Sequence, residues 1–340
     1  MVLRSFALIG ITAAMLGAAA CEGDRGPAGE AGEPGAPGDM GDPGDPGDPG
    51  TPGTCGATEI LLPGSSTFPE GIAAAADGTL YVGSLTTGEV FAHAECDVFP
   101  TVFADVGDVS AVGMLVDEEN QALWVCAGDP NTGNDPAIVG FALADGAELA
   151  RHPFADDTGF CNDLILDSAG NLYATDSFGD RVMTVAAADL MTDASDAAEW
   201  LTDPAFESAG FGLNGIAADS NDTLYFSKFD TGEIFRVEIA GSGEPTGLTE
   251  IAVDPALNGP DGLEVLDDGT LLVVEGFVDE LSAIALDGDA GESIVVSNRL
   301  DGPTTLAISG DSAWVVEGQV SDLIEQTQPD VPFRVVRVPL

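Results

Sequence analysis

The chain has 340 residues, more than one domain usually needs, and its 59 acidic residues outnumber nine basic ones, for a formal net charge of −50. Such a charge repels phosphate backbones and anionic headgroups, so it argues against a protein that binds nucleic acid or a lipid surface. The hydrophobic fraction of 44% argues against a disordered acidic chain, and two histidines, His93 and His152, are too few for histidine-rich metal or triad chemistry.

Residues 1–20 have the pattern of an export signal. Arg4 is followed by an apolar stretch too short to span a bilayer, and small residues precede Cys21. This pattern resembles a bacterial lipoprotein signal, with Cys21 as the lipidated first residue, although Ala18 stands where leucine is usual. Ala18-Ala19-Ala20 is also compatible with an ordinary cleavage site. Both alternatives predict an extracytoplasmic protein: a lipoprotein of the bacterial cell envelope, or a secreted protein if Cys21 is not lipidated.

Residues 21–56 contain a collagen-like stalk. Glycine recurs at every third position from Gly23 to Gly56, and three Gly-Asp-Pro units follow one another from Gly41. Only glycine fits at the axis of three wound polyproline-II chains, so this period is typical of collagen. The stalk would form a short triple helix and a homotrimer, or else an extended, proline-stiffened spacer.

Residues 57–340 contain six repeats of one sequence pattern. Each has an apolar segment, a polar or acidic turn, and a second segment such as Leu80-Tyr81-Val82. The repeats begin at Gly71, Gly113, Asp163, Gly215, Gly262 and Thr305, between 42 and 52 residues apart. Repeats of this length with turn-bounded strands predict an all-β protein, a six-bladed β-propeller of four-stranded blades.

The two ends of this segment are expected to pair. The last repeat ends with the strand-like segment 334–338 and has no fourth strand after it, whereas segment 59–62 precedes the first repeat. Pairing of the two would complete the last sheet and remove an open edge.

Oxygen-bearing side chains recur just before the repeat starts. The residues at this position are Glu70, Val112, Asn162, Asn214, Asp261 and Thr304. Equivalent positions of innermost strands lie on a ring around a propeller axis, so a carboxylate or amide from four repeats would point at one centre. A cluster of this kind is costly unless paired, and it suits Ca²⁺ better than zinc. The alternative is that these side chains cap strands and bridge blades through water.

These motifs resemble the gluconolactonase/regucalcin (senescence marker protein) family over roughly residues 57–340. The segments that match in order are 69–71, 162–163, 213–215 and 260–262. The resemblance implies a six-bladed propeller with a central divalent metal, held by Glu70, Asn214 and Asp261. It places Asn162 beside the metal, in contact with substrate or its water, and makes Asp261 the candidate base.

Two departures from the family bear on the substrate. Sugar-lactone members place an arginine two residues before the Asn-Asp pair, where this chain has Phe160, and this argues against a polyhydroxylated sugar acid. The histidine pair of the related paraoxonases is not evident, and we expect His93 and His152 on the surface. Phe160, Phe211 and Phe229 would form an apolar wall suited to a hydrophobic ligand, or pack between blades.

A second ring is predicted at the ends of the second strands. Its members are Ser84, Ala127, Asp176, Lys228, Glu275 and Glu317. Its charged members are candidates for contacting substrate in the channel. Lys228 would orient a substrate carbonyl or neutralise the neighbouring acids.

Four cysteines follow Cys21 in a protein expected to reach an oxidising compartment. Three pairings are possible. We favour Cys126 with Cys161, both near the channel mouth, which leaves Cys55 for Cys96. Free thiols, or Cys55 linking separate chains, remain the alternatives.

Two functional hypotheses follow. The first is an extracytoplasmic Ca²⁺-dependent hydrolase acting on a small ester or lactone, with membrane contact only through the lipid anchor and with another divalent metal as an alternative ion. The second is a non-catalytic surface propeller with a structural metal, used for binding or adhesion.

Overall fold

The computed structural model describes residues 56–192 and 195–340. The predicted signal, the lipidation site Cys21 and the stalk up to Cys55 lie outside these residues, so these predictions and the domain boundaries drawn from them stay predictions.

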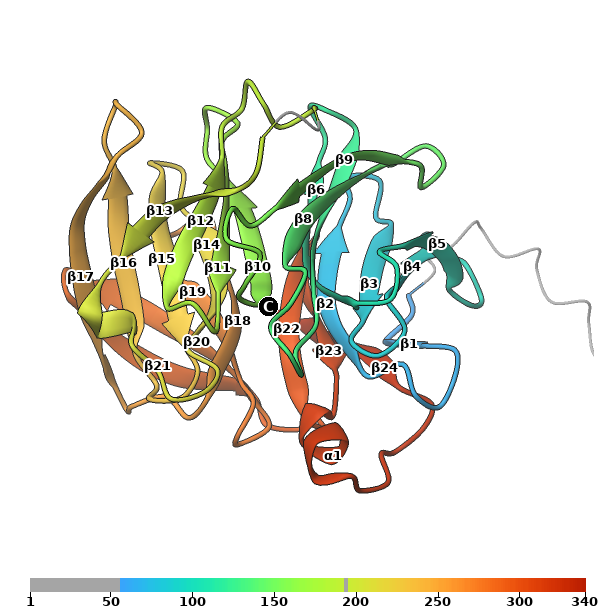
Figure 1. The fold of residues 1–340 in the computed structure, drawn as a ribbon. Helices are drawn as coiled ribbons and strands as arrows, with labels where there is room; N and C mark the ends of the chain where they lie inside the picture. The colour runs from blue at the N-terminus through green and yellow to red at the C-terminus, as the bar shows by residue number, and fades with distance from the viewer. Residues whose placement is uncertain (1–55, 193–194) are drawn as a thin grey trace, which may run out of the picture. The chain divides into compact units, whose positions relative to one another are not determined.

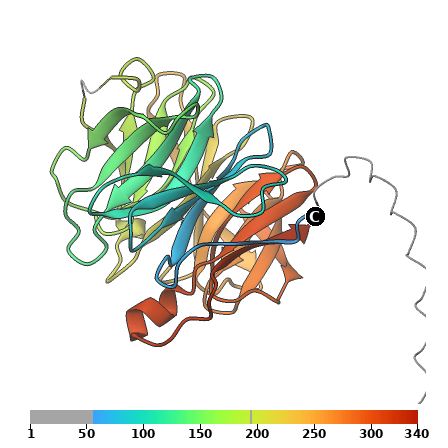
Figure 2. The ribbon, with the colours of Figure 1, turned by 90° about the vertical axis from the view of Figure 1, so that its right-hand side faces the viewer.

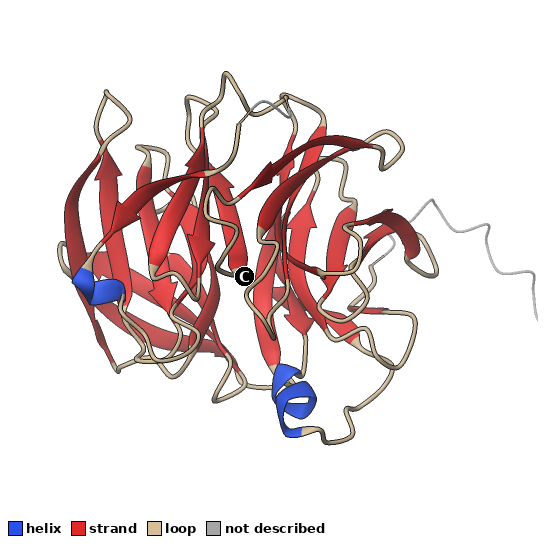
Figure 3. Ribbon diagram, in the orientation of Figure 1, coloured by secondary structure: helices blue, strands red, loops and turns tan. Residues whose placement is uncertain are grey.

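The described residues form an almost entirely β structure, so the predicted all-β class is confirmed. They contain 24 strands, a short 3-10 helix, η1 (Pro204–Phe206), and one short α-helix, α1 (Val320–Glu325) (Figure 3). Neither described helix has the length and apolar character that crossing a bilayer requires.

The strands form four sheets of four and one sheet of eight. The first three follow chain order: β2 (Pro69–Ala74), β3 (Leu80–Ser84), β4 (Glu89–His93) and β5 (Thr101–Asp105); β6 (Ser110–Asp117), β7 (Ala122–Gly128), β8 (Ala137–Ala142) and β9 (Glu148–Pro153); β10 (Cys161–Leu166), β11 (Leu172–Asp176), β12 (Arg181–Val185) and β13 (Ala198–Thr202). The eight-stranded sheet has the order β14 (Leu213–Ala218), β15 (Thr223–Lys228), β16 (Ile234–Ile239), β17 (Pro245–Asp254), β21 (Ala290–Ser297), β20 (Glu280–Asp287), β19 (Leu271–Glu275) and β18 (Pro260–Val265).

The last sheet joins the two ends of the described chain. Its order is β1 (Glu59–Leu61), β24 (Arg334–Pro339), β23 (Ser312–Glu317) and β22 (Pro303–Ser309). Ile60 of β1 pairs antiparallel with Val335 of β24, which confirms the predicted pairing of segments 59–62 and 334–338. The first strand thereby covers an edge that the last strand would otherwise leave open.

The first strands of the repeats, β2, β6, β10, β14, β18 and β22, form a closed ring. Each contacts the next, and β22 contacts β2. The sheets are arranged side by side around this centre in two perpendicular views (Figures 1 and 2). Residues far apart in sequence are thereby brought to a common axis.

Burial decreases from the middle of each four-stranded sheet to its outer strand. Every residue of β3 and β7 is buried, whereas most of β5 is exposed. Strands covered on both faces bury nearly continuous apolar sequence, as in Leu123-Trp124-Val125 of β7. Apolar side chains from neighbouring sheets fill the space between them, which holds the central ring in place.

The surface placement expected for the histidines is wrong. His93 is buried, and His152 has no solvent exposure. The His152 ring nitrogens lie 2.8 and 2.9 Å from the carbonyl oxygens of Ser195 and Leu190. His152 of the outer strand β9 is therefore covered by the connection that contains Leu190 and Ser195, and no local sequence pattern indicates this.

Candidate functional site

A β-bulge occurs at the same point in all six innermost strands. In β2, for example, Pro69 pairs with Ser84 and Ile72 with Val82, so Glu70 and Gly71 stand outside the regular pairing. Equivalent shifts occur in the other five innermost strands. The six residues predicted to form the ring each occupy the first bulge position. A bulge bends its strand and re-aims a side chain, which here turns the ring residues toward the axis.

The residue that follows each ring residue occupies the second position of the bulge. At this position neighbouring innermost strands approach each other closely. A Cβ atom added at Gly71 would lie 1.9 Å from the Val112 carbonyl oxygen, and one at Gly262 would lie 2.0 Å from Thr305 Oγ1. Only glycine permits this approach at these two positions. The glycines that mark the repeats thus set the width of the central ring.

Hydroxyl groups of neighbouring strands hold the backbone of the ring residues. Thr175 Oγ1 donates to the Asn214 carbonyl oxygen at 2.5 Å, and Ser227 Oγ donates to that of Asp261 at 2.6 Å. The first bond joins β11 to β14 of the next sheet, and the second joins β15 to β18 within the eight-stranded sheet. The ring residues are therefore fixed by tertiary contacts as well as by their own strands.

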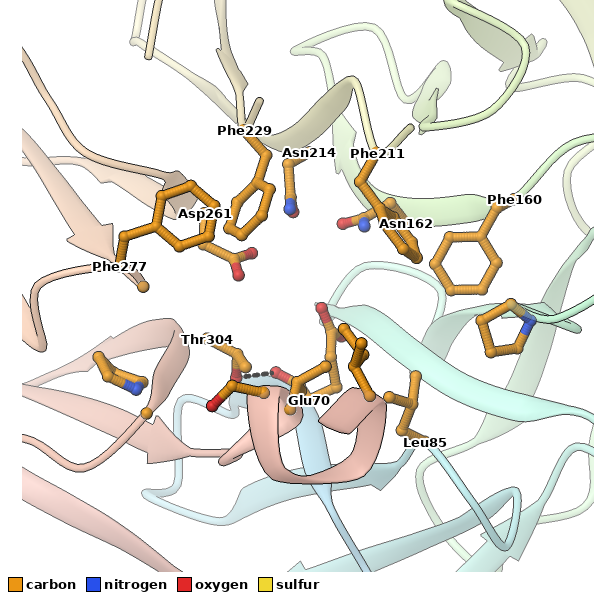
Figure 4. Close-up of a pocket in the computed structure, with 17 residues that line it drawn as sticks. Glu70, Leu85, Phe160, Asn162, Phe211, Asn214, Phe229, Asp261, Phe277 and Thr304 are labelled. Atoms are coloured by element: carbon orange, nitrogen blue, oxygen red, sulfur yellow. Dashed lines mark hydrogen bonds between the residues drawn. The ribbon is translucent and has the colours of Figure 1, made fainter. Parts of the chain in front are cut away.

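The four predicted oxygen ligands meet at one place. Glu70, Asn162, Asn214 and Asp261 are all buried, and they line both a larger open cavity and a small one beside it (Figure 4). The small cavity has a volume of about 10 Å³, close to the minimum for one water molecule. The arrangement offers two carboxylates and two amides around a space for a single small species.

Two ring carboxylates have oxygens without partners. In the described residues, Glu70 Oε2, Asp261 Oδ1 and Ser195 Oγ are the buried side-chain atoms that lack a hydrogen bond. Burial raises the pKa of Glu70 well above its usual range, and the charges of Asp261 and Asp163 raise it further. Burial also raises the pKa of Asp261, as does the charge of Asp163, while a hydrogen bond from the Asn214 side chain opposes the rise.

These residues fit a hard divalent cation. Oxygen ligands without other partners are what Ca²⁺ prefers, and two carboxylates would balance its charge. The described residues contain no group of three or more His, Cys, Asp or Glu side chains arranged to hold a metal. A cation at the ring would therefore depend on the amide oxygens of Asn162 and Asn214, and water would complete its shell.

Asp163 lies next to the ring and was missed as a site residue by the sequence analysis. Its carboxylate accepts hydrogen bonds from the Leu164 amide at 2.9 Å and from the Ile216 amide of the neighbouring strand at 3.2 Å. Burial raises the pKa of Asp163 to about 7, although both hydrogen bonds lower it. The available signal was a charged residue at a position where four other repeats have glycine.

The predicted second ring does not line the larger cavity. Ser84, Asp176, Glu275 and Glu317 are buried, but their side chains bind the loops that precede the ring strands. Asp176 accepts from the Phe160 amide at 2.8 Å, Glu275 from the Asn258 amide at 2.8 Å, and Glu317 from the Asp301 amide at 3.1 Å. The substrate-contact role predicted for these three acids is therefore replaced by loop anchoring.

Lys228 is also absent from the cavity lining. It is buried, and its Nζ lies 3.8 Å from Asp230 Oδ1. Asp176 instead pairs with Arg181 at 2.8 Å, and Glu317 pairs with Arg334. The geometry thus favours the alternative in which Lys228 neutralises an acid. That acid is Asp230, and not one of the second-ring acids that were expected.

The cavity wall above the ring is apolar. Phe160, Phe211, Phe229 and Phe277 line it, together with Leu85 and residues of α1. In Figure 4, Phe229 and Phe277 lie on one side of the ring, and Phe160 and Phe211 on the other. The structure thus places the three phenylalanines of the predicted wall in the cavity and adds Phe277.

A disulfide links the site to its neighbouring sheet. Cys126 of β7 is bonded to Cys161 of β10, with 5.1 Å between Cα atoms, which is the pair favoured from the sequence. Cys161 immediately precedes Asn162, so the bond restrains a ring residue. The pairing of Cys55 with Cys96 stays a prediction because Cys55 lies outside the described residues.

No protein-family model matches this chain, and no curated protein sequence matches it. Several solved structures match it. A luciferin-regenerating enzyme is 15% identical to this chain with a TM-score of 0.60, and the match covers 83% of this chain and 95% of the enzyme. A candidate gluconolactonase is 15% identical, with a TM-score of 0.59 over 83% and 92%. Virginiamycin B lyase from Staphylococcus aureus is 18% identical, with a TM-score of 0.56 over 76% and 80%.

At these identities the similarity concerns the fold. It agrees with the closed ring of innermost strands, and it supports the resemblance to the gluconolactonase/regucalcin family at that level. The chain has a propeller-type fold.

Proposed function

We propose that this protein is a Ca²⁺-dependent hydrolase of lactones or esters, built on a propeller of six four-stranded blades. In this count the eight-stranded sheet contains two blades, joined by the parallel pairing of β17 and β21. The observation that carries the proposal is the pair of unpartnered carboxylate oxygens, Glu70 Oε2 and Asp261 Oδ1, on the floor of an open apolar cavity.

Glu70, Asn214 and Asp261 would hold the cation, with Asn162 beside it. When bound, the cation supplies a positive charge that polarises a carbonyl oxygen and stabilises negative charge developing there. The Asn162 side chain would orient the substrate or its water, and the Asp261 carboxylate would accept the proton of the attacking water. A bond then forms between the water oxygen and the carbonyl carbon, the carbon–oxygen bond of the ester breaks, and the departing oxygen gains a proton.

The expected location is outside the cytoplasm, with Cys21 as a lipid anchor and the Gly-X-Y stalk as spacer or trimerisation segment. The Cys126–Cys161 disulfide supports an oxidising compartment. The net charge of −50 argues against nucleic acid as a partner.

The test is hydrolysis of a panel of aliphatic and aryl lactones and esters by the purified protein, with chelator and after Ca²⁺ is returned. We expect turnover that is lost with chelator, restored by Ca²⁺, and abolished in a folded Asp261→Asn variant. Absence of turnover on the whole panel, with Ca²⁺ still raising the melting temperature, would favour the binding propeller with a structural metal.

A further inference from the structure

Two phenylalanine groups contribute to the wall of the larger cavity. Phe160 and Phe211 line it and contact each other at 5.8 Å between ring centroids, and both contact Phe178, which is not part of the lining. Phe229 and Phe277 line it as a second pair at 4.7 Å. Offset and tilted aromatic pairs of this kind stabilise one another, so the two groups form firm surfaces. A ligand above the ring would lie between them (Figure 4).

Polar groups are almost confined to the cavity floor. The polar side chains that line the cavity are Glu70, Asn162, Asn214, Asp261, Thr304 and Ser321, and no lysine or arginine lines it. All except Ser321 of α1 belong to the innermost strands. A polyhydroxylated ligand would bury hydroxyl groups against phenylalanine without hydrogen-bond partners, and each such group costs binding free energy.

The cavity is small and open at its mouth. Its volume of about 170 Å³ is close to that of an engineered apolar cavity that accepts benzene. At the mouth, Phe277 and Ile324 are 64% and 67% exposed, so apolar surface continues outward. A substituent longer than one ring could therefore extend along this surface.

We infer that the substrate is a lactone or ester with an apolar alkyl or aryl substituent, and that these phenylalanine groups with α1 determine this specificity. The inference rests on the proposed function. The carbonyl group of the substrate lies at the oxygen-lined floor, and the substituent lies between the phenylalanine groups. Phe277 and Ile324 determine specificity at the mouth.

The first test compares kcat/KM for δ-lactones that share one ring and carry alkyl chains of increasing length, with gluconolactone as the polyhydroxylated member. Burial of each methylene raises kcat/KM by up to about fourfold until the chain leaves the wall. A profile that does not change with chain length, or a preference for gluconolactone, overturns the inference while leaving the proposed hydrolase in place.

Variants at the cavity mouth distinguish contact between substrate and cavity wall from a general effect of exposed apolar side chains. Phe277→Ala and Ile324→Ser lower kcat/KM more for long-chain lactones than for the unsubstituted lactone, and so reduce the preference for long chains. Phe99→Ala and Ile294→Ser serve as controls, because these residues are 68% and 62% exposed but do not line the cavity. Equal effects of control and mouth variants overturn the assignment.

A binding experiment keeps the inference testable without turnover. Calorimetry with 2-alkylcyclopentanones, which keep a ring carbonyl but cannot be hydrolysed, measures affinity directly. Affinity that rises with chain length and falls in Phe277→Ala supports an apolar ligand even if no lactone is hydrolysed, whereas affinity independent of chain length overturns it. Failure of all turnover on lactones and esters contradicts the proposed hydrolase alone.

Discussion

Thr304 and Glu70 are 234 positions apart in the chain, yet Thr304 Oγ1 donates a hydrogen bond to the Glu70 carbonyl oxygen at 2.9 Å (Figure 4). The bond joins β22 to β2, the last and first innermost strands. It therefore couples closure of the ring to the position of a predicted cation ligand.

Replacing Thr304 with valine should loosen that closure. The substitution keeps the shape of the side chain but leaves the buried Glu70 carbonyl without this donor, which costs about 1–3 kcal/mol. We expect lower stability to denaturant and weaker Ca²⁺ affinity by calorimetry. Thr246→Val is the control, because Thr246 Oγ1 donates to the Glu238 carbonyl at an exposed position. If Thr304→Val leaves Ca²⁺ affinity unchanged, the bond does not position Glu70.

Replacing Glu70 with glutamine should separate stability from cation binding. The neutral amide removes a buried charge that faces Asp261 and Asp163, so in chelator the variant should melt at or above the wild-type temperature. The melting temperature of the variant should no longer rise when Ca²⁺ is added. Glu250→Gln, an exposed substitution, should keep the full Ca²⁺ response. A full response in Glu70→Gln would exclude Glu70 as a ligand.

The acid groups near the ring predict how stability changes with pH. Burial, followed by the charge of Asp163, raises the pKa of Glu264 to about 8, from an unfolded value of about 4.3. Between these two pKa values, the Glu264 carboxyl group keeps a proton in the folded protein that it has released in the unfolded chain. The contribution of Glu264 to the free energy of unfolding is therefore complete below about pH 4 and is lost as pH rises toward 8.

Melting temperatures measured in chelator from pH 5 to 9 test this prediction. The wild-type protein should lose stability across the range, and Glu264→Gln should show a shallower loss because its amide does not titrate. Parallel curves for the two proteins would contradict the role assigned to Glu264.

The anchoring role of Asp176 predicts a large effect on stability. Asp176 is fully buried and binds both the Phe160 amide and the Arg181 guanidinium, so Asp176→Asn breaks a buried ion pair at a cost of about 3–5 kcal/mol. Asp156 binds the same arginine at 2.8 Å from an exposed position, and Asp156→Asn should cost at most about 1 kcal/mol. The free energies of unfolding of the two variants, measured with denaturant, are then compared. Similar losses would mean that Asp176 does not anchor the loop.

Several features of the site could be predicted because they depend on repetition. Glu70, Asn162, Asn214 and Asp261 occupy the same place in their repeats, and equivalent places in sheets around one axis meet at one centre. The same reasoning assigned β1 to the last sheet. The glycine positions were visible too, although their role in close strand approach was not.

The acids at the ends of the second strands show where this reasoning fails. Asp176, Glu275 and Glu317 share a position as regularly as the ring does, but they bind loop amides instead of facing the cavity. A carboxylate at a strand end turns toward whichever donors lie nearest. Those donors are backbone amides of loops 16 or 17 residues earlier, and no sequence pattern identifies them.

Repeat spacing, glycine placement and the identity of the ring residues were thus present in the order of amino acids, because they arise from one structural unit used again and again. The burial of His152, the place of Asp163 beside the ring and the addition of Phe277 to the predicted apolar wall depend on packing in the folded protein. Such contacts depend on distances between segments that are remote in the chain, and those distances exist only once the ring has closed.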